Sequence, residues 1–379
     1  MKLGIDISQI VFGGTGVSTY TRLLVNSLCR EATDDEIVLF GSSLRNQKPL
    51  KDFYKLVSAK NIKKKFFPFP SKALEFLWNG IHVFPIENLI GPIDVFHSSD
   101  WLEPPTSYAK KVTTIHDLTI FKYPYTFVAR GGHDIVENQK RKLFFVKQYG
   151  DKIIAVSETT KQDIIDILKI PEKKIKVVYE AADPDFSPRP VSQIQKVKEK
   201  FLINNGRYLL CVGAREPRKN LNRLIAAFVE IAGANPDLSL VIVGKYGWGD
   251  DINQNTKNQI PKIKLLGFVE KEDLAALYSG AEGFIYPSLY EGFGLPILEA
   301  MACGCPVITS NLGSMKEIAG ESALLIEPEN VESIVGAISK ICRNKKVSEE
   351  LKIKGFKRAG EFNWQKTASQ TLEVYRALF

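Results

Sequence analysis

The segment SLYEGFGLPILEAMACG, residues 288–304, decides how the rest of the chain is interpreted. It places Glu291 before a glycine turn and Glu299 in the first turn of the helix that Pro296 predicts. Amides at a helix N-terminus bind anions, and glycines let a phosphate approach the backbone closely. A nucleotide sugar would fit an anion site with a carboxylate on each side, because its diphosphate lies between two groups that carry hydroxyls. The alternative is that Glu299 only complements the helix dipole and Glu291 only caps the turn.

Short β-branched runs alternate with helical patterns along the chain, which predicts parallel sheets covered on both faces. The proline-rich stretch 183–190 separates two series of such runs and predicts a hinge. Because 379 residues exceed one ordinary core, we expect two domains, 1–185 and 186–362, and a final helix, 363–379, packed back toward the first. The predicted strands are 3–7, 36–40, 93–97, 112–115, 152–156 and 175–178, then 208–212, 238–243, 263–266, 283–286, 307–309 and 323–326.

Composition narrows the class of protein. Apolar residues make up 44% and charged residues 25%, as in ordinary globular proteins. The sequence contains neither a signal peptide nor an apolar run of about 18 residues, and five scattered cysteines without metal spacing predict reduced thiols. These features predict a cytoplasmic protein. The net charge of +8 favours anionic partners, namely nucleotide phosphates, an anionic bilayer or nucleic acid.

A second motif, VGAREPRKN at residues 212–220, follows a predicted strand with a basic turn. Cations at this place can neutralise the charge that develops on a leaving diphosphate. The candidates are Arg215, Arg218 and Lys219, and the alternative is a solvated basic turn. Two later strand ends, with Lys245 in one turn and Phe268 and Val269 in the other, are further candidates because ligands collect at the carboxyl ends of parallel strands.

The segment from Glu291 to Glu299 resembles the E-x7-E signature of glycosyltransferase family 4, and its surroundings extend the match from Pro287 to Ser314. The resemblance implies the GT-B architecture, two Rossmann-like, doubly wound parallel-sheet domains facing a central cleft. It also implies transfer of a sugar from a nucleotide donor, with retention of anomeric configuration.

The resemblance also assigns roles to residues of the second domain. Glu299 is expected to bind the ribose hydroxyls and Glu291 the hydroxyls of the donor sugar. The backbone amides of Gly292, Phe293, Gly294 and Leu295 are expected to bind the diphosphate. Lys219 matches the family's diphosphate-binding lysine. Ala214 stands where many members have a diphosphate-binding arginine, and whether Arg215 or Arg218 takes over that role is open. The turn with Phe268 and Val269 is expected to hold the base, mainly through backbone groups.

In the first domain, the sequence GGTGVSTY at residues 13–20 lacks the lysine of a P-loop and the third glycine of a dinucleotide fingerprint. It resembles the glycine-rich loop of family 4, which lies against the donor phosphate and the acceptor. Gly14 and Gly16 are its candidate residues, although Thr19 stands where many members carry arginine.

Two histidines follow predicted strands of the first domain. His116 is similar to the family histidine that contacts the donor sugar, and the alternative is a buried histidine with satisfied hydrogen bonds. For His97 we expect the buried role.

Residues 60–78 combine lysines with large aromatic side chains. Such a segment can rest on an anionic membrane or hold a lipid-linked acceptor, and the equal alternative is a solvated edge beside a core helix. A membrane contact would place the protein at the inner face of the cell membrane.

The predicted function is therefore that of a retaining hexosyltransferase with His116, Lys219 and Glu291 in catalytic roles. The resemblance to mannosyltransferase-type members favours GDP-mannose, and the expected acceptor is a saccharide or lipid-linked saccharide in polysaccharide or glycolipid assembly. No metal or other cofactor is expected, and the leaving phosphate is expected to assist the acceptor. The alternatives are a UDP-sugar as donor and a non-catalytic protein that binds nucleotide sugars. An oxidoreductase is disfavoured because the dinucleotide-binding glycine fingerprint is incomplete, and binding of nucleic acid is not expected.

Overall fold

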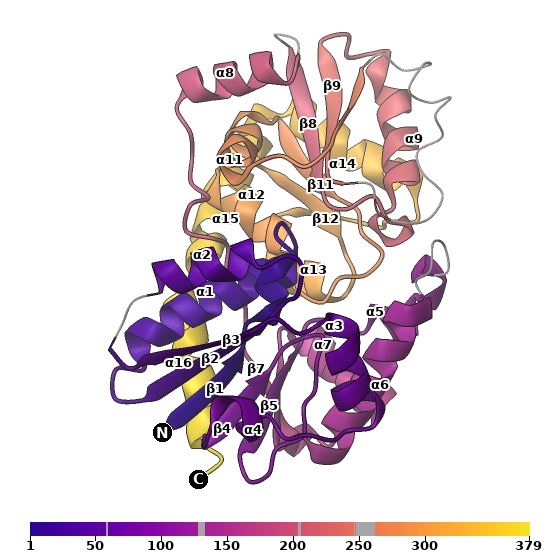
Figure 1. Ribbon diagram of the computed structural model, residues 1–379. Helices are drawn as coiled ribbons and strands as arrows, with labels where there is room; N and C mark the ends of the chain where they lie inside the picture. The colour runs from indigo at the N-terminus through magenta and orange to yellow at the C-terminus, as the bar shows by residue number, and fades with distance from the viewer. Residues whose placement is uncertain (58–59, 128–132, 204–205, 246, 248–261) are drawn as a thin grey trace. The chain divides into compact units, whose positions relative to one another are not determined.

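The computed structural model spans residues 1–379 and describes all of them except 58–59, 128–132, 204–205, 246 and 248–261 (Figure 1). The chain divides into two units. The N-terminal unit comprises Met1–Lys122, Gly131–Glu180 and Asn363–Phe379, and the C-terminal unit comprises Tyr123–Arg130 and Ala181–Phe362.

The N-terminal unit contains a seven-stranded sheet of order β3-β2-β1-β4-β5-β6-β7, in which every pairing is parallel. Isoleucine, valine and phenylalanine fill the central strands because both faces of the sheet are covered. The strands are β1 Lys2–Asp6, β2 Glu36–Ser42, β3 Ile62–Phe67, β4 Val95–Ser98, β5 Lys110–Ile115, β6 Lys152–Ala155 and β7 Ile175–Val177. The helices include α1 Gly16–Glu31, α2 Lys48–Leu56, α3 Ser71–Leu74, η2 Glu75–Gly80, α4 Glu87–Ile90, α5 Thr119–Lys122, α6 His133–Tyr149, α7 Glu158–Asp163 and α16 Trp364–Arg376.

The edge strand β3 was not predicted from the sequence. Its three central residues are lysines, all of them exposed, and Lys63 forms a 2.9 Å ion pair with Glu36 of β2. Charged side chains on an edge strand prevent pairing with other chains, so β3 carries no hydrophobic strand pattern.

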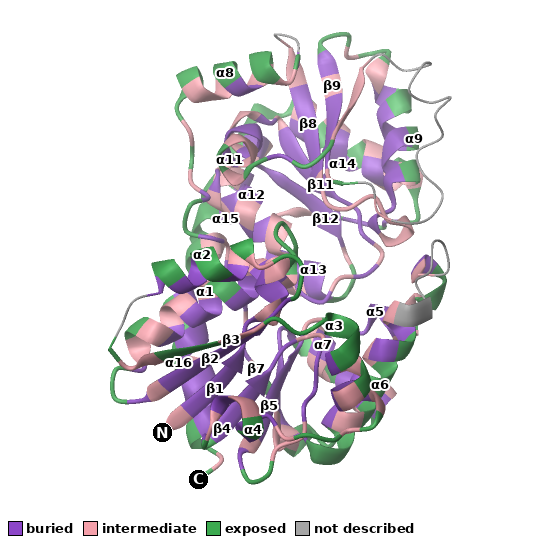
Figure 2. Ribbon diagram, in the orientation of Figure 1, coloured by how far each residue is buried: buried purple, intermediate pink, exposed green. Residues whose placement is uncertain are grey.

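The C-terminal unit contains a six-stranded parallel sheet of order β10-β9-β8-β11-β12-β13. One face packs under α9 and α14, and the core there includes Leu209, Ile242, Phe228 and Ile338. The strands are β8 Arg207–Val212, β9 Leu238–Val243, β10 Ile263–Leu266, β11 Gly283–Tyr286, β12 Val307–Ser310 and β13 Leu324–Ile326. The helices include α8 Val191–Lys200, α9 Leu221–Ala232, α11 Lys271–Gly280, α12 Leu295–Ala302, α13 Gly313–Ala319, α14 Val331–Arg343 and α15 Lys345–Gly360. Figure 2 shows that the strands of each sheet are largely buried, whereas exposed residues gather on helices such as α6 and α8.

Each sheet has one topological switch point, where the strand order reverses. It lies between β8 and β11 in the C-terminal unit and between β1 and β4 in the N-terminal unit. Ligands of open α/β sheets bind outside the carboxyl ends of the strands at such points. The two switch points are therefore the places to look for binding sites.

Candidate functional site

The C-terminal switch point is built around the start of α12. Gly294 precedes this helix with φ of +107°, a conformation that glycine adopts without strain, and Pro296 lies in the first turn. The Ser314 hydroxyl donates a 2.7 Å hydrogen bond to the Glu291 carbonyl and fixes the turn from α13. Gly292, Phe293 and Gly294 are buried and Leu295 is half-buried, so the backbone amides at the helix start are held in place.

Two cations from the turn after β8 hold the carboxylate of Glu291. Lys219 Nζ lies 2.6 Å from Glu291 Oε1, and Arg218 Nη1 lies 2.6 Å from Oε2. Lys219 also donates a 2.7 Å hydrogen bond to the Tyr286 hydroxyl, and Arg218 is paired with Glu216 at 2.8 Å. The structure thus brings together two predicted motifs that lie about 70 residues apart in the chain.

Burial and the two cations set the charge state of this cluster. Burial raises the pKa of the Glu291 carboxyl, but the charges of Arg218 and Lys219 outweigh it and bring the pKa to about 2. Burial and the neighbouring Arg218 lower the pKa of Lys219, although Glu291 and Glu216 oppose the change. Glu291 is therefore a carboxylate at neutral pH and can accept hydrogen bonds from hydroxyl groups.

Glu299 lies in a different environment on α12. The Tyr278 hydroxyl donates a 3.0 Å hydrogen bond to Glu299 Oε2. Burial raises the pKa of Glu299 to about 7, and Asp183 adds to this effect while Tyr278 and Lys271 oppose it. The two glutamates of the E-x7-E segment therefore differ in charge state.

Two glycines bring the ends of β8 and β9 together. Gly244 has φ of +150°, and a Cβ atom there would lie 1.9 Å from the Gly213 carbonyl oxygen. Next to this contact, the Arg215 amide donates a 3.0 Å hydrogen bond to the Lys245 carbonyl. Arg218 is the arginine that pairs with Glu291, and a diphosphate-binding role for Arg215 or Arg218 stays a prediction.

The turn after β10 presents one exposed ring. Phe268 is 49% exposed and lies under Lys245, whose Nζ is 4.8 Å from the ring centroid, whereas Val269 is buried. An aromatic ring at a strand end offers a face on which a nucleobase can stack.

In the N-terminal unit, the glycine-rich loop connects η1 (Ser8–Val11) to α1. Gly14 has φ of +81°, and Thr15 caps the helix by accepting a 3.2 Å hydrogen bond from the Ser18 amide. Gly14 and Gly16 are both exposed.

His116 lies at the carboxyl end of β5 and is held by a residue that sequence reasoning missed. Its Nδ1 is 2.8 Å from Glu180 Oε1, and its ring meets the Tyr20 ring edge-on, with the centroids 4.6 Å apart. Burial lowers the pKa of His116, but Glu180, with Asp100 and Asp117, outweighs burial and raises it. Glu180 follows β7, and its position after a predicted strand was the only available signal.

His97 is a core histidine, as expected. Its Nδ1 is 2.6 Å from the Tyr375 hydroxyl and its Nε2 is 2.9 Å from the Thr114 hydroxyl. Burial, with the charges of Lys142 and His116, lowers its pKa to about 3.

The segment 60–78 divides between core and surface. Leu74 and Trp78 belong to the hydrophobic core, where Trp78 is fully buried, while Phe76 is 63% exposed. Beside it, η2 and α6 line a groove of about 350 Å³, with Arg141, Lys140 and Phe144 among its walls. Part of the segment is therefore core, and the exposed aromatic side chains continue onto α6.

Within the described ranges, no helix is long and apolar enough to cross a membrane. The same ranges hold no group of three His, Cys, Asp or Glu side chains arranged to bind a metal ion, and independence of metal stays a prediction.

Comparisons with known proteins place both halves of the chain. The family model described as Glycosyltransferase Family 4 matches residues 14–186, and that described as Glycosyl transferases group 1 matches residues 193–358. The chain is 29% identical to the O-antigen chain mannosyltransferase B of Escherichia coli, over 100% of both chains. It is 30% identical to an uncharacterized glycosyltransferase of Methanocaldococcus jannaschii, over 75% of each chain.

Solved structures share the fold. A sucrose-phosphate synthase from Thermosynechococcus elongatus superposes with a TM-score of 0.75 at 20% identity, covering 100% of this chain and 99% of that chain. A glycosyltransferase involved in lipopolysaccharide biosynthesis gives a TM-score of 0.71 at 12% identity, covering 99% of both chains.

Proposed function

Because the chain belongs to glycosyltransferase family 4, we propose that it transfers mannose from GDP-mannose to a saccharide or lipid-linked saccharide, with retention of anomeric configuration. The observation that carries the proposal is the cluster of Lys219, Arg218 and Glu291 at the start of α12, with Glu299 farther along the same helix. In this proposal the C-terminal unit holds the donor and the N-terminal unit the acceptor.

The donor site combines three kinds of group that a sugar nucleotide needs. The amides at the start of α12 and the cations of Lys219 and Arg218 attract the diphosphate. Glu291, ionised at neutral pH, accepts hydrogen bonds from hydroxyls of the sugar. Glu299, whose pKa is about 7, binds the ribose hydroxyls in this proposal. The exposed ring of Phe268 lies in the turn proposed to hold the base.

The proposed reaction exchanges two bonds at the anomeric carbon. The bond to the leaving phosphate breaks and the bond to the acceptor oxygen forms on the same face of the sugar. The acceptor proton passes to the leaving phosphate, so no protein nucleophile is required. Lys219 and the helix amides stabilise the negative charge on that phosphate, which is where electrostatic stabilisation contributes most.

Relatives support mannose as the sugar. Besides the Escherichia coli protein, the O-antigen chain mannosyltransferase RfbU of Salmonella typhimurium is 31% identical over 60% of both chains. Similar structures have also been solved with UDP-glucose, so a UDP-sugar is the second candidate donor. O-antigen assembly is accordingly the pathway class that we propose.

Calorimetric titration with GDP-mannose, GDP-glucose, UDP-glucose and ADP-glucose tests the donor. We expect saturable binding of GDP-mannose that is stronger than binding of the other three, followed by transfer to glycosides with an unchanged anomeric configuration in the proton NMR spectrum. Stronger binding of UDP-glucose would identify it as the donor in place of GDP-mannose. Binding without turnover would favour a non-catalytic binding protein, and no binding of any of the four would refute the proposal.

We further propose that the N-terminal unit rests on the inner, anionic face of the cell membrane. Phe144 is exposed in the groove that Lys140 and Arg141 also line, Phe76 is exposed on η2, and the lysines of β3 add positive charge in the same unit. Exposed aromatics with cations favour an anionic lipid interface. Co-sedimentation with phosphatidylglycerol vesicles tests this: we expect binding that Phe76→Ser with Phe144→Ser weakens, and equal binding to neutral phosphatidylcholine vesicles would contradict it.

A further inference from the structure

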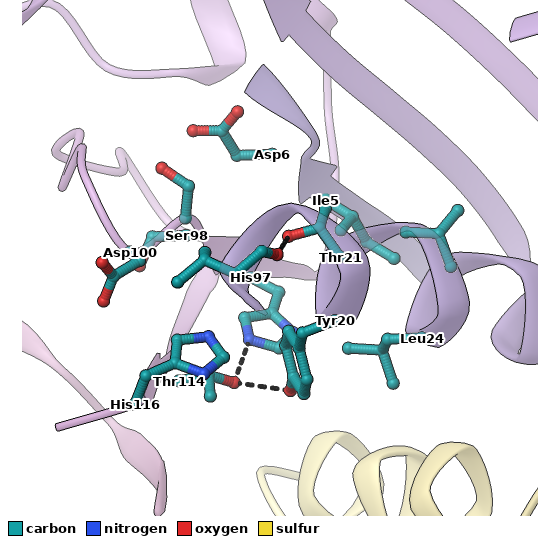
Figure 3. Close-up of a pocket in the computed structure, with 13 residues that line it drawn as sticks. Ile5, Asp6, Tyr20, Thr21, Leu24, His97, Ser98, Asp100, Thr114 and His116 are labelled. Carbon is teal, nitrogen blue, oxygen red and sulfur yellow. Dashed lines mark hydrogen bonds between the residues drawn. The ribbon is translucent and has the colours of Figure 1, made fainter. Parts of the chain in front are cut away.

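A small polar pocket lies at the switch point of the N-terminal unit, between the ends of β1 and β4 (Figure 3). Asp6 ends β1, Ser98 ends β4, and Ser99 and Asp100 follow it, so the carboxyl ends of the two strands supply one wall. Residues of α1 and the end of β5 supply the rest, including Tyr20 and His116. Nothing in the donor chemistry described above uses this pocket except His116.

Asp6 presents an unsatisfied carboxylate oxygen to the pocket. Only 3% of the residue is exposed, and its Oδ1 accepts a 2.8 Å hydrogen bond from the Ser8 amide. Its Oδ2 is buried and has no hydrogen-bond partner among the described residues. Burial raises the pKa of Asp6, with Ser8, Ser99 and Lys142 opposing it. A buried polar atom without a partner is costly unless a ligand or water completes it.

The polar side chains on the opposite wall of the pocket already have hydrogen-bond partners within the protein. The Thr114 hydroxyl lies 2.9 Å from His97 Nε2 and 3.0 Å from the Tyr20 hydroxyl, so these three side chains bond to one another, as the dashed lines in Figure 3 show. His116 is likewise bound to Glu180 through Nδ1. The carboxylates of Asp6 and Asp100 lie on the other side in Figure 3. Asp100 Oδ2 already accepts a 3.5 Å hydrogen bond from Gln139 Nε2, so Asp6 Oδ2 is the pocket oxygen that a ligand would satisfy.

Size and charge restrict the ligand. The cavity is about 20 Å³, which is room for a single water-sized group. A carboxylate only accepts hydrogen bonds, whereas a protonated carboxyl also donates, and a hydroxyl group can partner either form because it both donates and accepts. A phosphate is too large for this space, whereas a sugar hydroxyl fits.

We infer that this pocket binds one hydroxyl group of the acceptor saccharide, through the carboxylates of Asp6 and Asp100, and so selects the acceptor. A hydroxyl there would complete the hydrogen bonding of the buried Asp6, and the half-buried Asp100 lines the same pocket. The inference rests on the proposed transfer function, and it adds the residues that decide which saccharide is accepted.

The test measures acceptor and donor separately. The wild-type protein is assayed with GDP-mannose and the octyl glycosides of mannose, glucose, galactose, rhamnose and N-acetylglucosamine, and the accepted glycoside is compared with its monodeoxy analogues. Removal of one particular hydroxyl should lower kcat/KM about tenfold or more, because a site built for a hydroxyl rejects the analogue without it.

Asp6→Asn and Asp100→Asn keep the shape of each side chain, and in Asp6→Asn the remaining side-chain oxygen can still accept from the Ser8 amide. Both variants should raise the acceptor KM about tenfold. In both, loss of the hydroxyl from the acceptor should lower kcat/KM only about threefold or less. The GDP-mannose Kd should stay within about twofold of wild type. Asp52→Asn, with the same charge change at a side chain that is 51% exposed on α2, should match wild type.

The remaining outcomes separate the inference from the function on which it rests. Unchanged acceptor KM and unchanged deoxy penalty in both variants would overturn the inference while leaving the proposed function intact. Turnover of GDP-mannose by water but transfer to none of the five glycosides would also overturn it. Absence of binding of any nucleotide sugar would overturn the proposed function itself.

Discussion

The two switch points have the same topology and opposite chemistry. In the C-terminal unit, Lys219 and Arg218 surround one ionised carboxylate at the start of a helix. In the N-terminal unit, Asp6 and Asp100 line a pocket in which Thr114 is hydrogen-bonded to His97 and Tyr20. A parallel sheet therefore fixes where a ligand binds, while the side chains at the strand ends fix which ligand it is.

This contrast matches the two substrates of the proposed reaction. A diphosphate needs cations and amides, and a neutral sugar needs hydrogen-bond acceptors. Substitutions that alter one site at a time test this match.

Lys219→Met should have the largest effect. The substitution keeps the length of the buried side chain but removes the charge beside Glu291, so kcat with GDP-mannose should fall about 100-fold to 1,000-fold. Steady-state kinetics measure the loss, and circular dichroism verifies the fold. Lys340→Met, at an exposed position of α14, is the matched control and should leave kcat unchanged. A rate within a few-fold of wild type in Lys219→Met would end the cationic role assigned to the C-terminal switch point.

Glu299→Gln tests the difference between Glu299 and Glu291, the two glutamates of the E-x7-E segment. The folded protein holds a proton on Glu299 up to a pKa of about 7, whereas the unfolded chain releases it near its ordinary value of 4.5. The folded state thus binds more protons between these values, and wild-type stability should fall as pH rises from 4.5 to 7, by about 1–3 kcal/mol. Urea unfolding at several pH values measures it.

In Glu299→Gln this part of the pH dependence should disappear, because glutamine does not titrate. Glu291, whose pKa is about 2 in the folded protein, is present in both proteins, so its contribution to the slope cancels in the comparison. Identical slopes in wild type and variant would contradict the assignment of the raised pKa to Glu299.

Glu180→Gln should have a smaller effect, confined to the N-terminal unit. Loss of the carboxylate that faces His116 Nδ1 should lower the pKa of His116 and reduce kcat/KM about tenfold, with the GDP-mannose Kd little changed. NMR titration of the imidazole measures the pKa of His116, and steady-state kinetics measure kcat/KM. Glu172→Gln, at a 70% exposed side chain, is the control. An unshifted His116 pKa in Glu180→Gln would show that Glu180 does not set its charge.

The fold was largely predictable from the sequence. The predicted GT-B architecture is confirmed, because buried parallel strands carry β-branched runs that stand out between amphipathic helices. The strand β3 was not predicted because its three lysines, which suit the edge of a sheet, leave no apolar strand pattern in the sequence.

The sites were predictable only where the pattern is local. Glu291, Glu299 and Lys219 lie in short motifs, so the sequence singled them out. Glu180 and the pocket around Asp6 did not emerge, since they depend on contacts between strand ends far apart in the chain, 64 residues apart for His116 and Glu180.

Hydrogen–deuterium exchange with and without GDP-mannose tests the central claim most directly, because it reports where the donor binds. We predict slower exchange at residues 213–220 and 288–299 of the C-terminal unit, and loss of that protection in Lys219→Met. Binding of GDP-mannose with no protection in either segment would contradict the assignment of the donor site to the C-terminal switch point.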